Sequence, residues 1–494
     1  MSTLTYRQRE FIESLLSRER GTVIKPFGSR LSAAICFPNQ YYLGASNLGV
    51  HFLYREINSR EDWLAERVFT DISPSVSLEN QRPLSDFDVI IFTVPFELDF
   101  ANVLKMLVDA GIEPESEKRG SDDPLIIAGG VAVSMNPRPL WRFMDIMVVA
   151  EGEAALPKLL AVLSETSADK SSFLKAMEDE DGVITSRSSI QENDTKGSRI
   201  HCQELSEPVY SVFLSPDTEF KDTCLVELAR GCPFSCAFCY IGNTSGPFRP
   251  FPAESVIRTI EKNMHRTRRF GLVSSAVGSH AQLEEICNFC LERGLNISFS
   301  SLRADALTEP LMKILLESGQ KTLTIAPETG SENLRRKLRK SLSCDQIITS
   351  VKKAMNFGFE NIKLYFILGL PGETEDDLEE TTTMIKDIRE IVLREGKKRG
   401  KVGNIIVSFS FFVPKPGTPL EKEPAIDVSE MKKKQRLMLK QLRPLPHVSV
   451  LPADPHSARA QALLSSGGKE TGEFLLNKIK RRLSWKTALS QYKP

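Results

Sequence analysis

Two stretches of the chain alternate short apolar runs with amphipathic helical patterns, and they define its organisation. The first stretch covers residues 31–163. We predict strands at Leu31–Phe37, Asp88–Val94, Pro124–Ala128 and Asp145–Val149, and helices at Leu48–Ile57, Asn102–Ala110 and Ala154–Leu163. Strands that alternate with helices indicate βαβ units and a parallel sheet. The pattern therefore predicts an α/β domain with a Rossmann-like, doubly wound parallel sheet.

The second stretch covers residues 221–420 and repeats the strand–helix pattern six times. We predict strands at Cys224–Leu228, Gly271–Ala276, Ile297–Leu302, Leu323–Ala326, Asn361–Leu368 and Asn404–Val413, and helices at Ser255–Met264, Leu283–Arg293 and Glu309–Ser318. Six β/α units predict a partial (β/α)6 barrel. A barrel of this kind places its chemistry on the loops at the carboxyl ends of the strands.

Three further segments flank these domains. Residues 1–30 are predicted to hold an N-terminal helix, and residues 164–220 read as a polar linker with a hairpin near Pro208–Leu214. Residues 421–494 are expected to form a small C-terminal extension that covers the barrel or faces the substrate. Its predicted elements are a basic helix at Ser429–Arg443 capped by Ser429, a strand at His447–Pro452, and helices at Ala458–Leu464 and Phe474–Leu483.

Composition places the chain among ordinary globular proteins. Of its 494 residues, 41% are hydrophobic and 26% are charged, and the length suits two or three domains. No apolar run is long enough to span a membrane, and the N-terminus lacks the apolar core of a signal peptide. Nine cysteines, three of them clustered, suit a reducing compartment better than a disulfide framework. We therefore expect a cytoplasmic protein.

Charge gives no global attraction to nucleic acid, because 64 Lys and Arg residues balance 64 Asp and Glu residues. Basic residues do cluster locally at 335–340, 432–434 and 480–482. Solvated helix faces are the ordinary explanation of such runs, and a site for a polyanion such as nucleic acid is the alternative.

The candidate chemistry centres on a cysteine run. Cys232, Cys236 and Cys239 form a C-x3-C-x2-C motif just after the first predicted barrel strand. Iron–sulfur clusters and structural zinc sites usually take four protein ligands, so a set of three predicts an open coordination position. Buried small side chains or half of a zinc site are the alternatives. The neighbouring Gly231 and Pro233 indicate a loop, which favours the cluster.

The spacing of this run resembles that of the radical S-adenosylmethionine superfamily, and the resemblance covers roughly residues 220–420. It implies a [4Fe-4S] cluster on Cys232, Cys236 and Cys239, with S-adenosylmethionine on the open iron. It also implies an electron donor such as a flavodoxin or ferredoxin, and reductive cleavage of S-adenosylmethionine that starts radical chemistry.

The same resemblance implies further contacts with S-adenosylmethionine. These residues are Phe238, Tyr240, Ser275, Arg303, Glu328 and Gly369. Glu328 could equally be an acid at a helix N-terminus, and Arg303 could instead form a surface ion pair with Asp305 or Glu309. No catalytic acid or base is indicated.

The N-terminal domain resembles the cobalamin-binding domain attached to many radical S-adenosylmethionine proteins. The loops that carry this resemblance contain Asn47, Gly129, Gly130, Glu151 and Gly152. The family's Asp-x-His-x-x-Gly motif, which supplies an axial histidine, does not occur in this chain. His51 lies on an apolar stripe and is expected to be a packing residue. Either cobalamin binds without a histidine ligand, or the pocket is altered.

A second cysteine pair lies at Cys287 and Cys290, inside a predicted helix. The chain offers no nearby pair of ligands to complete a metal site, and the other cysteines are scattered. We therefore expect both side chains in the hydrophobic core.

These observations favour a radical S-adenosylmethionine enzyme, with cobalamin-dependent methyl transfer to an unactivated carbon as the first choice of reaction. An RNA- or ribosome-modifying enzyme that resembles the methylthiotransferases is an alternative. Sulfur insertion in such enzymes usually requires a second cluster held by N-terminal cysteines, however, and residues 1–160 contain only Cys36. A non-catalytic iron–sulfur or S-adenosylmethionine sensor is another alternative. The substrate leaves no signature in the sequence.

Overall fold

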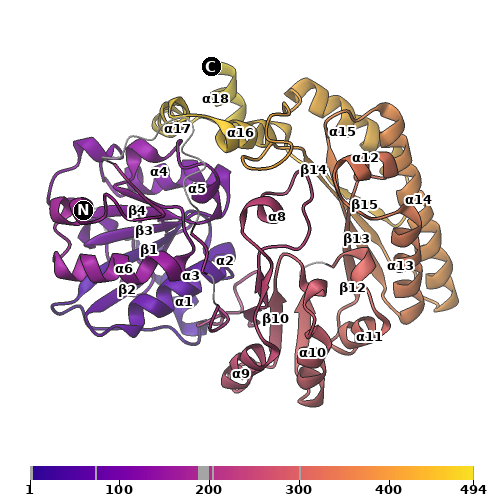
Figure 1. The fold of residues 1–494 in the computed structure, drawn as a ribbon, viewed down its shortest axis with the longest axis horizontal. Coiled ribbons are helices and arrows are strands. Elements are labelled where there is room, and N and C mark those ends of the chain that lie inside the picture. Colours follow the sequence, from indigo (N-terminus) through magenta and orange to yellow (C-terminus); the bar gives the residue numbers. More distant parts are fainter. Residues whose placement is uncertain (1–3, 73–74, 187–199, 203–204, 300–301, 493–494) are drawn as a thin grey trace. The chain divides into compact units, whose positions relative to one another are not determined.

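The structure is a computed structural model that describes residues 4–72, 75–186, 200–202, 205–299 and 302–492 (Figure 1). The chain divides into two compact units. Unit 1 contains Met1–Leu205, Val209–Cys224 and Leu463–Pro494, and unit 2 contains Ser206–Pro208 and Leu225–Ala462. Unit 2 is therefore inserted into the sequence of unit 1.

Unit 1 is built on a six-stranded sheet with the strand order β2-β1-β3-β4-β5-β6. The first five strands run parallel and β6 is antiparallel to β5. The strands are β1 (Leu31–Phe37), β2 (Trp63–Phe69), β3 (Val89–Thr93), β4 (Leu125–Gly129), β5 (Ile146–Val148) and β6 (Val183–Thr185). The order confirms the doubly wound sheet, with its switch point between β1 and β3.

Helices cover both faces of this sheet. Alternate residues along each strand point to opposite faces, and a separate core lies on each side. One face packs against α1 (Tyr6–Arg18), α3 (Leu48–Ser59), α6 (Gly152–Glu165) and α7 (Lys170–Ala176). The other packs against α4 (Phe100–Asp109), α5 (Val131–Met135), α17 (Glu470–Lys480) and α18 (Trp485–Gln491). The short helix α2 (Tyr41–Gly44) follows β1.

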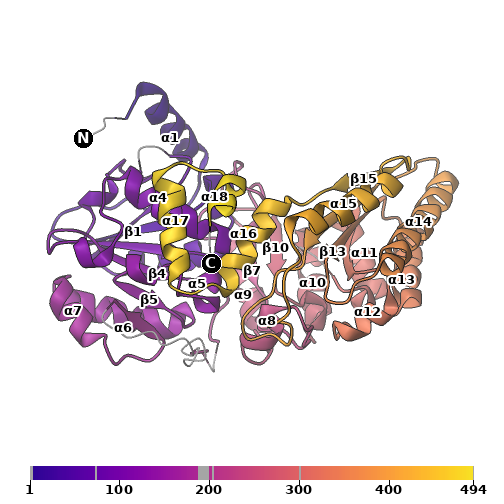
Figure 2. The ribbon, with the colours of Figure 1, turned by 90° about the horizontal axis from the view of Figure 1, so that it is seen from above.

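The C-terminal segment belongs to this second core. Leu475 is fully buried there, and α17 lies beside α4 (Figure 2). Asn136 Nδ2 donates hydrogen bonds to the carbonyl oxygens of Leu464 and Gly467 at 2.8 and 2.9 Å. The expectation that all of residues 421–494 extend the barrel is therefore corrected: from Leu463 onward they complete unit 1.

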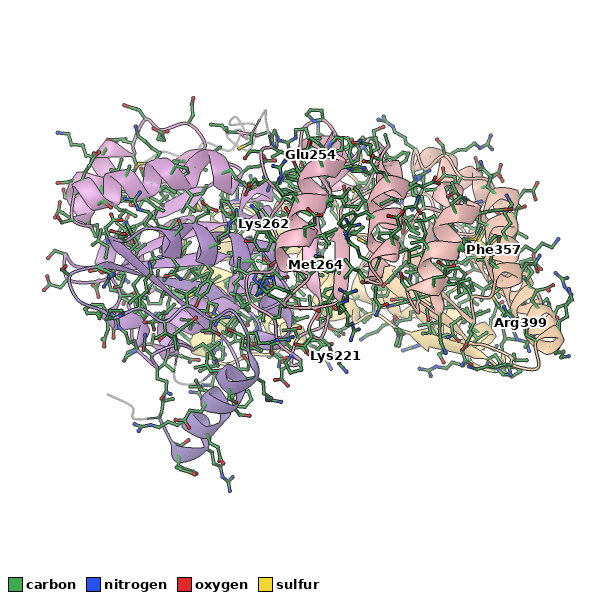
Figure 3. The ribbon with its side chains drawn as sticks, turned by 90° about the horizontal axis from the view of Figure 1, so that it is seen from below. Lys221, Glu254, Lys262, Met264, Phe357 and Arg399 are labelled. Carbon is green, nitrogen blue, oxygen red and sulfur yellow. The ribbon has the colours of Figure 1, made fainter. Side chains whose placement is uncertain are left out.

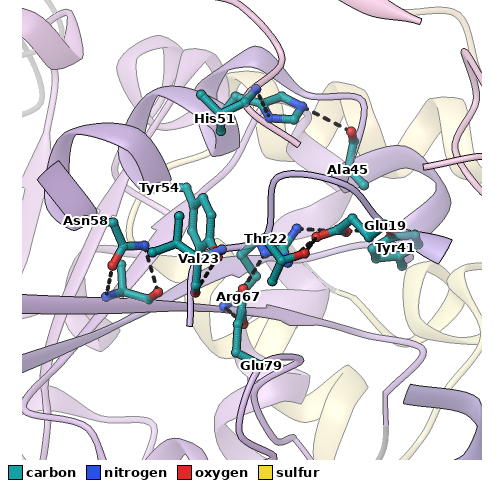
Figure 4. Close-up of polar contacts among 12 residues, drawn as sticks. Glu19, Thr22, Val23, Tyr41, Ala45, His51, Tyr54, Asn58, Arg67 and Glu79 are labelled. Carbon is teal, nitrogen blue, oxygen red and sulfur yellow. Dashed lines mark hydrogen bonds and ion pairs between the residues drawn. The ribbon is translucent and has the colours of Figure 1, made fainter. Parts of the chain in front are cut away.

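Strand β2 was missed by the sequence pattern because Glu66 and Arg67 stand in its middle. Both residues are fully buried. Arg67 is paired with Glu19 and Glu79 at 2.6 Å each (Figure 4). Its guanidinium also lies 3.9 Å from the centre of the Phe213 ring. A buried charge is tolerated only where such partners satisfy it, so this network ties the N-terminal segment to the edge of the sheet.

Unit 2 holds the barrel strands in two sheets, with the orders β11-β10-β7 and β12-β13-β14-β15. The strands are β7 (Cys224–Glu227), β10 (Arg269–Val273), β11 (Asn296–Phe299), β12 (Thr322–Glu328), β13 (Asn361–Leu368), β14 (Ile405–Phe411) and β15 (Val448–Leu451). A short antiparallel pair, β8 (Ala229–Arg230) and β9 (Arg249–Pro250), flanks the cysteine loop. The partial barrel is confirmed, and β15 extends it by one parallel strand.

Amphipathic helices connect these strands. They are α8 (Tyr240–Thr244), α9 (Ala253–Asn263), α10 (Leu283–Glu292), α11 (Glu309–Glu317), α12 (Glu332–Lys337), α13 (Cys344–Phe357), α14 (Glu375–Lys398) and α15 (Val428–Leu442). Arg399, at the end of α14, donates to the carbonyl oxygens of Met355 and Phe359 and so holds the end of α13 (Figure 3). Helix α16 (Pro455–Ser466) carries the chain from unit 2 into unit 1.

Two local expectations need correction. Helix α15 is capped by the side chain of Asp427, which accepts from the backbone N–H of Glu430, and not by Ser429. No hairpin forms among residues 208–214; instead Leu214 makes an isolated antiparallel bridge to Arg20. Residues 187–199 and 203–204 of the predicted linker lie outside the described residues. The same holds for residues 300–301 of the strand predicted at 297–302. Within the described part of the chain, no helix is long and apolar enough to cross a membrane.

Candidate functional site

The cysteine motif lies on the loop that follows the first barrel strand. The loop begins at Gly231, where φ is +70° and a Cβ would lie 2.4 Å from the carbonyl oxygen of Pro247. Only glycine fits this turn. The thiols of Cys232, Cys236 and Cys239 are free, and all three residues are partly exposed. They can therefore reach a ligand outside the core.

Backbone contacts hold this loop in place. Asn243 Nδ2 donates hydrogen bonds to the carbonyl oxygens of Cys236 at 2.9 Å and of Cys239 at 2.7 Å. The N–H of Ala237 donates to the carbonyl oxygen of Leu338 at 2.8 Å. The loop is thus ordered by the protein's own groups, which lowers the entropy cost of binding a ligand there.

The thiols lie among groups that act on their protonation. Burial raises the pKa of the Cys236 thiol, and the nearby Lys340 ammonium opposes that rise. Burial also raises the pKa of the Cys239 thiol, and the backbone N–H of Gly242 opposes it. Because thiolates are the metal-binding form of cysteine, cations and N–H donors at this position favour metal binding.

The donor set fits an iron–sulfur cluster better than a single metal ion. Among the described residues, no three His, Cys, Asp or Glu side chains converge closely enough to hold one ion. A structural zinc site closes four ligands on one ion, whereas cluster cysteines are ligands of different iron atoms. Three free thiols on one loop suit a cluster with one open iron.

Glu328 stands at the end of β12 in a strained conformation. Its φ is +68°, and the pairing of β12 with β13 shifts register between Ile325 and Glu328. The carboxylate accepts a hydrogen bond from Lys340 Nζ at 2.6 Å, with both side chains largely buried. A non-glycine residue at such φ costs about 1–3 kcal/mol, and this strain clusters at functional sites. The structure does not place Glu328 at a helix N-terminus, because Glu328 ends β12 and Ser331 is the N-cap of α12.

Arg303 lies near the cysteine loop but already has a partner. Its guanidinium pairs with Asp305 through two hydrogen bonds of 3.0 and 2.8 Å. The group also lies 3.8 Å from the centre of the Phe234 ring. The ion pair with Asp305 considered from the sequence is therefore present, and Arg303 still contributes positive charge near Cys236.

Two other predicted residues shape loops at the same ends of the strands. Ser275 Oγ donates a hydrogen bond to the carbonyl oxygen of Gly231 and so ties the loop after β10 to the cysteine loop. Gly369 has φ of +77°, and a Cβ there would lie 2.6 Å from the Ile426 side chain. Its N–H donates to Glu373 at 2.8 Å, which closes the turn after β13.

The predicted aromatic residues are packed beside the loop. Phe238 is partly buried against a hydrophobic cluster of Leu334, Leu338, Leu370 and Phe412. Tyr240 is buried at the start of α8. Unit 2 therefore brings the three cysteines, Phe238, Ser275, Arg303 and Glu328 to the ends of its strands.

The predicted cobalamin-type residues lie in unit 1, at the carboxyl edge of its sheet. Asn47 caps α3, because its Oδ1 accepts from the N–H of Val50 at 3.2 Å. Gly129 ends β4, and Gly130 follows it with φ of +106°, where a Cβ would lie 2.7 Å from the carbonyl oxygen of Val94. These positions shape the edge of the sheet.

Glu151 and Gly152 form the loop after β5. Glu151 Oε2 accepts from the N–H of Cys202 at 2.9 Å. A Cβ at Gly152 would lie 2.6 Å from the Phe52 ring, so glycine allows α6 to begin close against α3. The loop is compact and makes its contacts within unit 1.

Exposed apolar side chains occur shortly after three strands at this same edge. Tyr42, Leu43, Phe96 and Val131 are 45%, 37%, 41% and 41% exposed, and they follow β1, β3 and β4. Ligands of open α/β sheets bind at the carboxyl ends of the strands near the switch point. Large apolar side chains exposed at that place suit a ligand with an extensive apolar surface.

His51 is a packing residue, as expected. It is fully buried, its Nε2 lies 3.1 Å from the carbonyl oxygen of Ala45, and its Nδ1 accepts from the N–H of Val212. Its ring packs against Phe213 at 4.1 Å between ring centres. Both ring nitrogens are engaged by the backbone, so His51 is not placed to bind a metal.

Cys287 and Cys290 are also core residues, as the sequence indicated. Both are fully buried in α10, and burial raises the pKa of each thiol to about 12. At such values the thiols stay protonated, which disfavours metal binding.

Sequence reasoning missed Lys340 and Asn243. Lys340 ends the basic run at 335–340, which suggested a solvated helix face. In fact Arg335 is fully buried and donates to the carbonyl oxygens of Thr329 and Leu342, while Lys340 faces Glu328. An Asn four residues after the last cysteine was the available signal for Asn243.

The fold and the loop together define an α/β protein with three free thiols at the carboxyl end of its first barrel strand. Comparison with known proteins gives the family. The family described as "Radical SAM proteins, N-terminal" matches residues 49–185, and the family described as "Radical SAM superfamily" matches residues 226–385. The chain belongs to the radical SAM superfamily and is a radical SAM enzyme, with a [4Fe-4S] cluster and S-adenosylmethionine as the cofactors of that family.

Several relatives share long stretches with this chain. An uncharacterised protein of Methanocaldococcus jannaschii is 30% identical over 406 residues, which cover 81% of each chain. An uncharacterised methyltransferase of Pyrococcus horikoshii is 25% identical over 64% of this chain and 66% of its own. A tRNA-2-methylthio-N(6)-dimethylallyladenosine synthase of Photorhabdus laumondii is 27% identical, and the chain spans about half of its length, 53%.

Among solved structures, the chain resembles the cobalamin-dependent S-adenosylmethionine radical enzyme OxsB with aqua-cobalamin and S-adenosylmethionine bound. The TM-score is 0.50 and the sequence identity 16%, over 82% of this chain and 62% of that one. This likeness concerns the fold alone.

Proposed function

We propose that Cys232, Cys236 and Cys239 hold the [4Fe-4S] cluster through their thiolates. When bound, the cluster and S-adenosylmethionine supply reductive carbon–sulfur cleavage and a hydrogen-abstracting radical. The observation that carries this assignment is the loop itself, with three free thiols at the carboxyl end of the barrel. Asn243 positions the loop by holding two of its carbonyl groups.

The residues around Cys236 would bind the polar groups of S-adenosylmethionine. Glu328 and Lys340 offer an anion and a cation side by side, which complement an amino acid's ammonium and carboxylate. Arg303 adds a second cation and Phe238 an apolar surface that suits a purine ring.

Anaerobic reconstitution with iron and sulfide tests the assignment. We expect about four irons per chain and reductant-dependent release of 5′-deoxyadenosine. Cys236→Ala should lose both, while the control Cys202→Ala, outside the loop, should keep both. Full iron content in Cys236→Ala would contradict the assignment. An intact cluster that binds S-adenosylmethionine and never cleaves it under any reductant would favour a sensor.

For the reaction, we propose cobalamin-dependent methyl transfer to an unactivated carbon. The support is the exposed apolar edge of unit 1, where Tyr42, Phe96 and Val131 follow three neighbouring strands. A corrin ring presents a broad, largely apolar face to such side chains. His51 is committed to the core, so the corrinoid would bind without a histidine ligand from residues 31–160.

Retention of hydroxocobalamin tests this proposal. We expect about one corrinoid per chain after gel filtration, and at least about tenfold weaker binding in Tyr42→Ala/Phe96→Ala, because two large apolar contacts are lost. Phe357→Ala, at an exposed position in unit 2 (Figure 3), is the control and should bind normally. Absence of retained corrinoid in the wild type would reject methyl transfer by this route.

A methylthiotransferase-like reaction on RNA is the second candidate, supported by the tRNA-modifying relatives. Sulfur insertion of that kind uses a second cluster, however. Cys36 is the only cysteine among residues 1–160, and it is fully buried with a raised thiol pKa. A reconstituted iron content of about eight per chain would favour this candidate over methyl transfer.

A further inference from the structure

Helix α15 (Val428–Leu442) presents two different faces. Met431, Met438 and Leu442 are buried on one face. Lys433, Arg436, Lys440 and Arg443 are exposed, and their spacing of three, four and three residues places them along one stripe. We call these four residues the α15 stripe. At 1.5 Å per residue it is about 15 Å long.

Its neighbours in the sequence have other roles. Lys432 Nζ lies 3.3 Å from His456 Nε2, and Lys434 pairs with the buried Glu373 at 3.0 Å. Of the three consecutive lysines, only Lys433 therefore points outward. In the basic run at 432–434, Lys432 and Lys434 therefore contact other parts of the chain, and only Lys433 belongs to the α15 stripe.

The stripe carries nearly uncompensated charge. Residues 431–453 contain six Lys and Arg residues and no Asp or Glu. Arg436, Lys440 and Arg443 form no ion pair with any described residue, and Lys433 has only an exposed pair with Glu375 at 3.3 Å. Exposed pairs of this kind contribute little and exchange readily with other anions. A regular row of cations, three of them without an ion pair among the described residues, suits a partner with regularly spaced negative charges.

We infer that the α15 stripe binds the phosphodiester backbone of a nucleic acid. Along the axis of a duplex, each strand carries one phosphate about every 3.4 Å, so a stripe of about 15 Å laid along that axis spans about four phosphates of one strand. An anionic membrane is a poorer fit. A helix that binds a membrane surface exposes large apolar side chains beside its cations, and α15 exposes none.

Fluorescence anisotropy with a labelled RNA hairpin, over a range of KCl concentrations, tests this inference on the full-length protein. We expect Arg436→Glu/Lys440→Glu/Arg443→Glu to weaken binding at least about tenfold and to reduce the salt slope by roughly two, since three phosphate contacts are lost. The matched control is Lys352→Glu/Lys353→Glu/Lys386→Glu, which makes the same charge change at exposed positions on α13 and α14. The control should bind like the wild type.

Other ligands separate the alternatives. Equal binding of a DNA hairpin and the RNA hairpin, both lost in the stripe variant, supports recognition of the backbone. Equal loss in the stripe variant and the control would overturn the inference, because net charge alone would then explain binding. Stripe-dependent binding to phosphatidylserine vesicles but not to either hairpin would overturn it as well. The assay needs no turnover, so its result is independent of the proposed reaction.

Discussion

At the residue scale, the cysteine loop depends on one amide. Asn243 donates to two carbonyl groups of the loop, and both belong to cysteines proposed as ligands. The side chain is not one of the proposed cluster ligands. It fixes the backbone from which the thiols extend, so its contribution lies in the geometry of the site.

Asn243→Ala should therefore loosen the cluster without removing a ligand. Each lost hydrogen bond costs about 1 kcal/mol, so losing both should make reconstituted iron leave up to roughly thirtyfold faster under a chelator. Initial iron content should stay near that of the wild type. Asn296→Ala, at an exposed position on β11, is the control. An unchanged rate of iron loss in Asn243→Ala would show that the loop is held by other contacts.

Asp99 is a residue whose protonation bears on stability. Burial raises its pKa from 3.8 to about 6, while hydrogen bonds from Asn39 and Asn102 partly offset the shift. The folded state binds this proton more tightly than the unfolded state. The stabilisation is thus fully present below pH 4 and is lost as pH rises through about 6.

Asp99→Asn should remove this dependence. We expect the difference in free energy of unfolding between variant and wild type to change by roughly 1–3 kcal/mol between pH 4 and pH 7, in favour of the variant at the higher pH. Urea denaturation at several pH values measures it. A difference that is constant with pH would mean that Asp99 titrates normally in the folded protein.

At the scale of elements, glycines set how closely strands and helices approach. Gly130 and Gly111 both have positive φ, but a Cβ at Gly130 would meet the backbone of Val94, while one at Gly111 meets nothing within 4 Å. Substitution of Gly111 would therefore cause backbone strain alone, whereas substitution of Gly130 would add a steric clash.

Gly111→Ala should cost about 1 kcal/mol of stability through strain alone. Gly130→Ala should cost several times more, because the carbonyl oxygen of Val94 must move as well. Chemical denaturation of both variants gives the two free energies. Equal costs would show that the loop after β4 relaxes without difficulty.

Most helices and strands could be predicted from the sequence where a segment shows a single pattern, either helical or strand-like. β1 and β13 have the predicted bounds, because apolar residues dominate each run. β2 was missed since Arg67 interrupts its apolar pattern, and only the distant Glu19 and Glu79 explain that charge.

The candidate site was predictable only in part. The spacing of the cysteines is local, so sequence alone identified the loop. The pairing of Lys340 with Glu328 depends on a turn after α12 that brings a residue of a basic run inward. The packing of α17 on unit 1 joins segments more than 300 residues apart, and no local pattern carries that information.

At the scale of the whole molecule, unit 1 is assembled from distant parts of the chain. Leu475→Ala should destabilise it by about 2–5 kcal/mol, because a fully buried side chain on α17 is lost. Hydrogen exchange should then quicken in peptides from β3 and β4, while peptides from β13 and β14 keep their protection. Faster exchange in β13 and β14 instead would contradict the packing of α17 on unit 1.

The insertion of unit 2 also has a consequence for synthesis. The ribosome completes the first 205 residues long before it reaches Leu463, and at 5–20 residues per second the interval is roughly 15–50 s. During that time one face of the first sheet lacks α17 and α18. The nascent chain must therefore shield that apolar face, either by binding a chaperone or by delaying its collapse. The barrel of unit 2 can then finish folding before unit 1, although most of unit 1 precedes it in the sequence.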